Sequence, residues 1–343
     1  MNQVSKSVPV EPSLVEGARN AVGVCLCVQP HEKVTLITDH ASMEIAAALA
    51  AELDALGAPY SFWTLEEVAP RPLSEMPQPV LDDLETSQVS IFAAQAQANE
   101  LRSRMHMTEV VTRRKIRHAH MVNISKQIMR DGMRADFREV DRISLQVIEI
   151  VRAAALIRAK TPAGTDLVAE MNPDYKWLKT SGIISQNTWG NLPGGEIFTT
   201  PGEVNGTFVV DGVVGDYLCA KYGDLQGSPL TILIKGNRLA EVHSANHALE
   251  DEFWRYTHTD ENSDRVGEFA IGTNIGVRDV IGNILQDEKI PGVHIAFGDP
   301  YGSYTGAPWR CSTHIDVVGR KFDIWADDRM IMRAGEFILE GGL

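Results

Sequence analysis

The sequence RVGEFAIGTN occupies residues 265–274 and is followed by LQDEKIPGVHIAFGDPYGSYTGAPW at 285–309 and RCSTHIDVV at 310–318. His294 lies within Gly-Val-His-Ile-Ala-Phe-Gly, which has the β-branched and aromatic character of a buried strand. His314 and Asp316 are two positions apart, so on a strand both side chains project from the same face. Glu268 also interrupts an apolar run. Because unpaired burial of such groups is costly and metal coordination removes that cost, these segments predict strands that carry metal ligands.

A further candidate ligand, Glu196, stands in NLPGGEIFTTP at residues 191–201, where a Pro-Gly-Gly turn leads into an apolar strand start. The candidate ligands are therefore Glu196, Glu268, His294, His314 and Asp316. Three carboxylates and two imidazoles exceed what one tetrahedral zinc ion uses. They suit two divalent ions that share a bridging carboxylate and a water molecule. The set predicts a two-metal centre, with zinc, cobalt or manganese as the candidate ions.

The composition is that of a globular protein of 343 residues, with 44% hydrophobic and 23% charged residues. The net charge of −14 argues against a general nucleic-acid binder or a protein that binds anionic membranes. No apolar run approaches the roughly 20 residues of a membrane span, and the first residues lack the apolar segment of a signal peptide. The four cysteines show no C-x-x-C spacing, which argues against a disulfide scaffold or a zinc ribbon. We therefore expect a cytoplasmic protein.

The first half of the chain combines short apolar segments with a strongly helix-forming one. Residues 33–38, 59–64 and 89–94 are predicted strands, and residues 43–56 are a predicted helix that ends at Gly57. Strand, helix and strand joined by short connections are typical of an open parallel sheet. No G-x-G-x-x-G follows the first strand and no G-x-x-x-x-G-K-[ST] occurs, so a dinucleotide or nucleotide site lacks its phosphate-binding loop.

A basic segment with six arginines and lysines and three histidines lies between residues 102 and 120. One interpretation is a solvated helix face that follows the third strand. The other has His106 facing a ligand at the carboxyl edge of the sheet, where open α/β folds bind ligands. Residues 138–160 are predicted to continue as a long amphipathic helix whose apolar stripe belongs to the core.

The character of the sequence changes after Thr161-Pro162, which ends that helix. Pro, Gly, Asn and Thr cluster through residues 181–206, and short β-rich runs follow at 207–211, 230–235 and 237–242. We therefore expect a domain boundary near residue 160.

The predicted fold class is α/β. Residues 1–160 are expected to form an open parallel α/β domain, and residues 161–343 a β-rich α+β domain that carries the catalytic metal site.

The motifs N-L-P-G-G-E-I-F-T-x-P, G-E-F-A-I-G, D-E-K-x-x-G-x-H-I-A-F-G and T-H-I-D together resemble the aminopeptidase T-like thermophilic metalloaminopeptidases, peptidase family M29. The resemblance is strong over about residues 190–340. It implies a two-metal centre supplied by Glu196, Glu268, His294, His314 and Asp316, and a catalytic tyrosine at Tyr301, seven residues after His294. It also implies an N-terminal α/β domain joined to a C-terminal catalytic domain, in a homodimer that encloses the site.

The reaction that this resemblance implies is metal-assisted hydrolysis of an amide or N-terminal peptide bond, in a peptide or small-molecule substrate. Glu268 would bridge the ions or take the proton of the attacking water. Tyr301 would donate a hydrogen bond to the developing oxyanion.

Two alternatives to the hydrolase are open. The same superfamily contains dihydroxypyridine ring-cleaving dioxygenases, which keep a His and a His-x-Asp for one ferrous ion. In this chain the matching residues are His294, His314 and Asp316, and His106 falls where those enzymes carry a catalytic histidine. The other alternative is a structural or binding protein with a vestigial metal site. Glu196 and Glu268 favour the hydrolase, because extra carboxylates would crowd a mononuclear iron.

Overall fold

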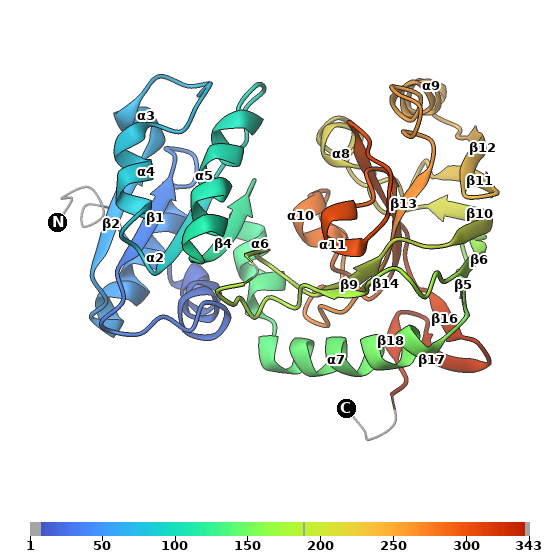
Figure 1. The fold of residues 1–343 in the computed structure, drawn as a ribbon, viewed down its shortest axis with the longest axis horizontal. Helices are drawn as coiled ribbons and strands as arrows, with labels where there is room; N and C mark the ends of the chain where they lie inside the picture. Colours follow the sequence, from blue (N-terminus) through green and yellow to red (C-terminus); the bar gives the residue numbers. More distant parts are fainter. Residues whose placement is uncertain (1–7, 188, 340–343) are drawn as a thin grey trace. The chain divides into compact units, whose positions relative to one another are not determined.

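The computed structural model describes residues 8–187 and 189–339, whose helices and strands are drawn in Figure 1. The chain forms two compact units, residues 1–138 with 182–194 and residues 139–181 with 195–343. The chain passes from one unit to the other after residues 138, 181 and 194, and not near residue 160 as predicted. The first boundary lies earlier because the apolar side chains of α7 (Phe137–Ala153), including Ile143 and Val147, belong to the core of the second unit.

A five-stranded parallel sheet forms the centre of the first unit, with the strand order β2-β1-β3-β4-β8. Its strands are β1 (Val34–Thr38), β2 (Tyr60–Thr64), β3 (Val89–Ala94), β4 (Arg117–Val122) and β8 (Gly190–Asn191). The strands β1 and β3 are buried at every position, as expected for a parallel sheet covered on both faces. The parallel α/β part of the predicted fold class is confirmed.

Helices connect the strands of this sheet. They are η2 (Pro12–Leu14), α1 (Val15–Arg19), η3 (Asn20–Cys25), α2 (Met43–Leu56), α3 (Leu65–Val68), α4 (Gln78–Leu84), α5 (Leu101–Arg114), α6 (Lys126–Arg130) and η4 (Gly132–Arg134). Figure 1 shows α2 and α5 beside the strands of the sheet. As predicted, α2 ends at Gly57, whose φ of 75° lets its N–H bond back to the carbonyl groups of Leu53 and Asp54.

The basic segment between residues 102 and 120 is not a single solvated helix face. Its helix, α5, ends at Arg114, and the last histidines of the segment lie in strand β4. His118 and His120 are buried there, and the ring nitrogens that face each other are 3.2 Å apart. The hydroxyl group of Ser90 bonds the other ring nitrogen of His118 at 2.8 Å. These partners offset the polarity of the imidazoles, which is why polar residues can form a central strand here.

Two antiparallel sheets make up most of the second unit. The larger has the order β12-β11-β10-β6-β5-β16-β17-β18. Its strands are β5 (Leu156–Lys160), β6 (Asp166–Glu170), β10 (Glu203–Val210), β11 (Leu230–Lys235), β12 (Arg238–His243), β16 (Asp323–Ala326), β17 (Arg329–Arg333) and β18 (Glu336–Phe337). The helix predicted over 138–160 is therefore too long, because its last five residues pair with β6 and β16 as strand β5.

The smaller sheet has the order β15-β14-β13-β9-β7 and carries the predicted metal ligands. Its strands are β7 (Leu178–Lys179), β9 (Glu196–Thr199), β13 (Val266–Gly272), β14 (Gly292–Gly298) and β15 (His314–Val318). The helices of this unit besides α7 are α8 (Asp216–Tyr222), α9 (His247–Tyr256), α10 (Ile284–Asp287) and α11 (Gly302–Thr305). The β-rich half of the predicted fold class is confirmed.

One hydrophobic core joins both sheets and α7. From the smaller sheet it takes residues of β9, β13, β14 and β15, among them Ile197, Phe269, Ile295 and Ile315. Because strand side chains alternate, the intervening residues of these strands project from the opposite face. The core therefore determines which face of the sheet is available to a functional site.

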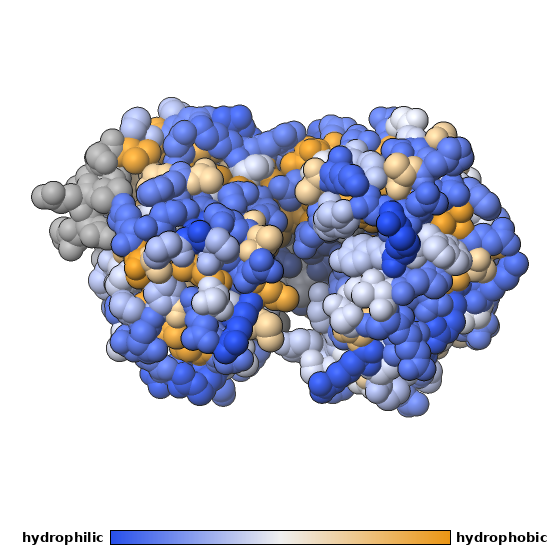
Figure 2. Space-filling model, turned by 90° about the horizontal axis from the view of Figure 1, so that it is seen from above, coloured by the Kyte–Doolittle hydropathy of each residue, from blue (hydrophilic) through white to orange (hydrophobic). Residues whose placement is uncertain are grey.

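No helix in the described ranges is long and apolar enough to cross a membrane. The molecular surface in Figure 2 is mainly hydrophilic, with hydrophobic side chains in separate patches, in line with the net charge of −14.

Candidate metal centre

The registers of β13, β14 and β15 place four predicted ligands on one face of the smaller sheet. Glu268 is opposite Ala296, and Ala296 is opposite Asp316. Residues that lie opposite each other in antiparallel strands share a face. His294 and His314 lie two positions from Ala296 and Asp316 along their own strands, so they project from the same face.

Glu196 joins this face from β9, where it is opposite Gly272 of β13. The positions between the ligands carry small residues. Ala270 is opposite His294, Ala296 separates Glu268 from Asp316, and Gly298 is opposite His314. Because no large side chain rises from these positions, the donor groups of neighbouring strands can converge above the sheet.

Glu268 reaches this face because the ladder between β13 and β14 is irregular at Gly267. The register shifts between Val266 and Glu268, which is the pattern of a β-bulge. As a result Val266 and Phe269 both belong to the core, and Glu268 projects from the other face. A side chain at Gly267 would come within 2.5 Å of the carbonyl oxygen of Gly298, so the bulge requires glycine.

The carboxylate of Glu268 is central to the cluster. Its Oε1 lies 3.5 Å from Nε2 of His294, and its Oε2 lies 3.5 Å from Nε2 of His314. Oε2 of Glu196 is 3.5 Å from Nε2 of His294, and Oδ1 of Asp316 is 3.4 Å from Nε2 of His314. The donor atoms thus form two groups, each within 4.8 Å: Glu196–Glu268–His294 and Glu268–His314–Asp316. All five predicted ligands are brought together, and Glu268 belongs to both groups.

The three carboxylates give the cluster a negative potential, which raises the pKa of both histidines. Burial lowers the pKa of an imidazole, but the carboxylate of Asp316 outweighs burial and raises the pKa of His314 to about 10. Burial likewise opposes the ionisation of Asp316, yet His314 lowers its pKa to about 2. The pKa of His294 is raised against the effect of burial by its hydrogen bond to Glu268 and by the charge of Glu196. A positive charge is therefore favoured at this place.

The donor set fits divalent metal ions. Carboxylate oxygens and imidazole nitrogens are ligands for zinc, cobalt and manganese. Nδ1 of His314 lies 3.0 Å from the carbonyl oxygen of Asp299, and this hydrogen bond directs Nε2 toward the cluster. One ion would be held by Glu196, Glu268 and His294, and another by Glu268, His314 and Asp316.

Two charged residues of the cluster, Glu288 and Lys289, lie in the D-E-K-x-x-G-x-H motif but are not among the predicted site residues. The Lys289 side chain is 1% exposed, and its Nζ lies 2.6 Å from Oε1 of Glu196 and 2.5 Å from Oε1 of Glu288. Burial raises the pKa of Glu288, and the ammonium group of Lys289 partly offsets this. For Lys289, burial opposes protonation, but the carboxylates of Glu196 and Glu288 prevail and hold its pKa above the usual range. Three consecutive charged residues directly before a buried strand, D-E-K, are the signal that could have indicated them.

Tyr301 lies beside the cluster, with its ring centroid 4.5 Å from that of His314 and 6.1 Å from that of Phe198. Its backbone has a φ of 49°, and its N–H donates to Oδ1 of Asp299 at 2.9 Å. Burial and the negative charge of Glu268 hold the pKa of its phenol well above the usual range. Because 41% of the residue is exposed, the negative charge is the cause that matters here. The hydroxyl group is therefore protonated at neutral pH and can donate a hydrogen bond.

His106 belongs to the first unit, where it lies on α5. Nε of Arg102, one turn earlier, donates to Nε2 of His106 at 3.5 Å. The catalytic role of His106 stays a prediction.

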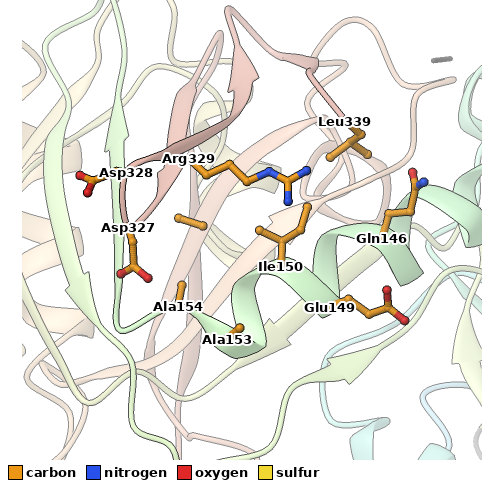
Figure 3. A pocket seen from close by; sticks show the side chains of 10 residues that line it. Gln146, Glu149, Ile150, Ala153, Ala154, Asp327, Asp328, Arg329 and Leu339 are labelled. Atoms are coloured by element: carbon orange, nitrogen blue, oxygen red, sulfur yellow. The ribbon is translucent and has the colours of Figure 1, made fainter. Parts of the chain in front are cut away.

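A separate pocket in the second unit has a volume of about 660 Å³ and lies between α7 and the turn after β16 (Figure 3). Its floor is apolar, and Figure 3 shows Arg329 extending toward Leu339 and Ile150. The carboxylate of Asp327 accepts hydrogen bonds from the N–H groups of Ala155 and Leu156, so it is part of the turn. The pocket contains no histidine and is not part of the metal cluster.

The family model of the thermophilic metalloproteases (M29) matches residues 145–308. This span includes Glu196, Glu268, His294 and Tyr301, and it ends before His314 and Asp316. Among curated proteins, none matches the chain.

Two solved structures share the fold over nearly the whole chain. The 2,5-dihydroxypyridine dioxygenase from Pseudomonas putida KT2440 has a TM-score of 0.69 and 16% identity, over 96% of this chain and 98% of that chain. AmpT from Thermus thermophilus has a TM-score of 0.66 and 17% identity, over 95% of this chain and 99% of that chain. The chain therefore has the fold of AmpT and of the dioxygenase, and over residues 145–308 it is similar to the thermophilic metalloproteases. The match to the metalloprotease family model supports the metalloaminopeptidase-like enzyme that the motifs predict.

Proposed function

We propose that the chain is a metal-dependent hydrolase that cleaves an amide or N-terminal peptide bond, with a water molecule activated between two divalent ions. The observation that carries the proposal is the carboxylate of Glu268. Its two oxygens each lie 3.5 Å from Nε2 of a different histidine, His294 and His314. A carboxylate shared by two donor groups is suited to bridge two ions. The preference for an N-terminal bond rests on the resemblance of the motifs to the aminopeptidase T-like family.

When bound, the ions would lower the pKa of a water molecule and polarise the scissile carbonyl group. The residues of the chain supply the remaining steps. Glu268, which is buried in the centre of the cluster, either bridges the ions or accepts the proton of the attacking water. Tyr301, whose phenol stays protonated, donates a hydrogen bond to the oxyanion that forms on the substrate. The small residues Ala270 and Ala296 leave the space above the sheet for the substrate.

A second candidate function is ring cleavage by a mononuclear Fe(II) dioxygenase. His294, His314 and Asp316 contain the two histidines and one carboxylate that such an iron uses, and His106 would be a further catalytic residue. The position of Glu268 argues against this candidate. It lies between the two histidines and belongs to both donor groups, so an ion bound by the histidines would also have Glu268 as a ligand.

The test combines metal removal with the exclusion of oxygen. After dialysis against EDTA, we expect hydrolysis of an amino-acyl amide to be lost and to return with cobalt, manganese or zinc. The rate should be the same under anaerobic conditions, because hydrolysis consumes no oxygen. Hydrolysis that survives complete metal removal would contradict the proposal, and oxygen-dependent turnover of a dihydroxypyridine would favour the second candidate.

A further inference from the structure

Lys289 places a fixed positive charge inside the candidate metal centre. Its Nζ bonds Oε1 of Glu196 at 2.6 Å, and the hydroxyl group of Thr180 donates to the same oxygen at 3.0 Å. Oε1 of Glu196 therefore already accepts two hydrogen bonds. Only Oε2, which is 3.5 Å from Nε2 of His294, faces the donor group. Glu196 can thus offer a metal ion one oxygen and not two.

The backbone holds Lys289 in this place. Its N–H donates to the carbonyl oxygen of Gln286 at 2.9 Å, and its own carbonyl oxygen accepts from the N–H of Asn274 at 3.1 Å. The following residue, Ile290, passes so close to β13 that a Cβ on Gly272 would lie 1.9 Å from its carbonyl oxygen. Gly272 is the residue opposite Glu196 in the sheet. The absence of a side chain at Gly272 therefore lets the Lys289 segment lie against the strand that pairs with β9.

The two donor groups consequently differ. In the group Glu268–His314–Asp316, neither carboxylate has a lysine or arginine within ion-pair distance in the described part of the chain. His314 is in addition oriented by the carbonyl oxygen of Asp299. In the group Glu196–Glu268–His294, one carboxylate is already paired with an ammonium group.

The charge of the whole cluster leads to the same asymmetry. With neutral imidazoles, the three ligand carboxylates and one ammonium group leave a formal charge of −2; they belong to Glu196, Glu268, Asp316 and Lys289. One divalent ion brings the charge to zero, whereas a second brings it to +2. Excess charge of either sign is costly in a buried site, so the second ion gains less than the first.

We propose that Lys289 is a built-in counter-ion that makes the two metal subsites unequal. A divalent ion binds tightly at Glu268–His314–Asp316 and more weakly at Glu196–Glu268–His294. Lys289 is a positioning residue in this role, because it orients and neutralises Glu196 and does not itself bind metal. The inference rests on the proposed metal-dependent function, but it concerns metal affinity and not turnover.

The test is a titration of the metal-free, full-length protein with Co²⁺, followed by calorimetry and by the visible absorption of the bound ion. In the parent, we expect the first equivalent to bind at least about tenfold more tightly than the second, because the second ion binds next to the ammonium group of Lys289. Asp316→Asn should remove the tight step and keep the weak one. Glu196→Gln should remove the weak step and keep the tight one.

Lys289→Met tests the counter-ion directly. It should tighten the second step by about tenfold, because the ammonium group no longer repels the second ion, and leave the first step nearly unchanged. The matched control is Lys179→Met, which removes a lysine that pairs with Asp141 in the same unit and should change neither step. Circular dichroism confirms that each variant is folded.

Equal affinities for two ions in the parent would overturn the inference, even if Lys289→Met does not fold. A Lys289→Met variant that folds and retains the parent's ratio of affinities would overturn it as well. A second step too weak to measure in the parent supports it only if this step appears in Lys289→Met; a single step in both proteins would overturn it. Two unequal steps in a protein that does not hydrolyse an amino-acyl amide would contradict the proposed function and leave this inference standing. Hydrolysis of an amino-acyl amide by a protein that binds two ions with equal affinity would support the proposed function and overturn this inference.

Discussion

The substitution Tyr301→Phe isolates a single hydroxyl group in the candidate site. The aromatic ring that remains can keep its contacts with His314 and Phe198, whose centroids lie 4.5 Å and 6.1 Å from that of Tyr301. The hydroxyl group is not among the donor atoms of the two ligand groups. The substitution therefore leaves the metal ligands in place and removes only the proposed hydrogen bond to the oxyanion.

The expected loss follows from that hydrogen bond. One donor to an oxyanion typically contributes about 2.7–4 kcal/mol, which corresponds to a decrease in kcat of roughly 100- to 1,000-fold. KM should change little, because the interaction forms in the transition state and not with the bound substrate.

The assay is steady-state hydrolysis of an amino-acyl amide, with the metal content of each protein measured in parallel. Tyr304→Phe is the matched control, since Tyr304 is 52% exposed and follows three residues later. An unchanged kcat in Tyr301→Phe, or a similar loss in both variants, would refute the assigned role. A loss of metal in Tyr301→Phe would also refute it, because the hydroxyl group would then support the ligands and not the transition state.

Two further predictions concern the assembly and the first unit. We propose that the chain is a homodimer, as its family resemblance implies; sedimentation at micromolar concentration should show twice the mass of one chain, and a monomer would contradict the proposal. Arg71→Met should destabilise the first unit by about 3–5 kcal/mol in denaturant unfolding, because Arg71 is 3% exposed and its loss leaves the carboxylates of Asp39 and Glu100 buried without their partner. The exposed pair of Arg102 and Glu75 provides the control, and Arg102→Met should change the stability by less than about 1 kcal/mol.

The sequence by itself determined the strands and the ligand types of the candidate site. His294, Glu268 and the His314–Asp316 pair each interrupt a run of apolar residues, so both the strand and the exceptional residue are visible locally. Alternation along a strand then places His314 and Asp316 on one face and Ile315 in the core, as the structure has them. The parallel sheet of the first unit was predictable for a similar reason, because β1 and β3 consist mainly of apolar and β-branched residues without charge.

Only the tertiary structure decided which segments become neighbours. The order β15-β14-β13-β9 brings Glu196 next to residues about 70 positions later, and local sequence carries no information on such pairing. Strand β4 is not visible in the local sequence because its histidines are polar. In the structure, His118 bonds Ser90 of β3, and His118 and His120 contact each other. Lys289 is an ordinary charged residue in the sequence. Its role in the candidate metal centre arises because Gly272 lets its backbone lie against β13, where the carboxylate of Glu196 offsets the cost of burying its charge.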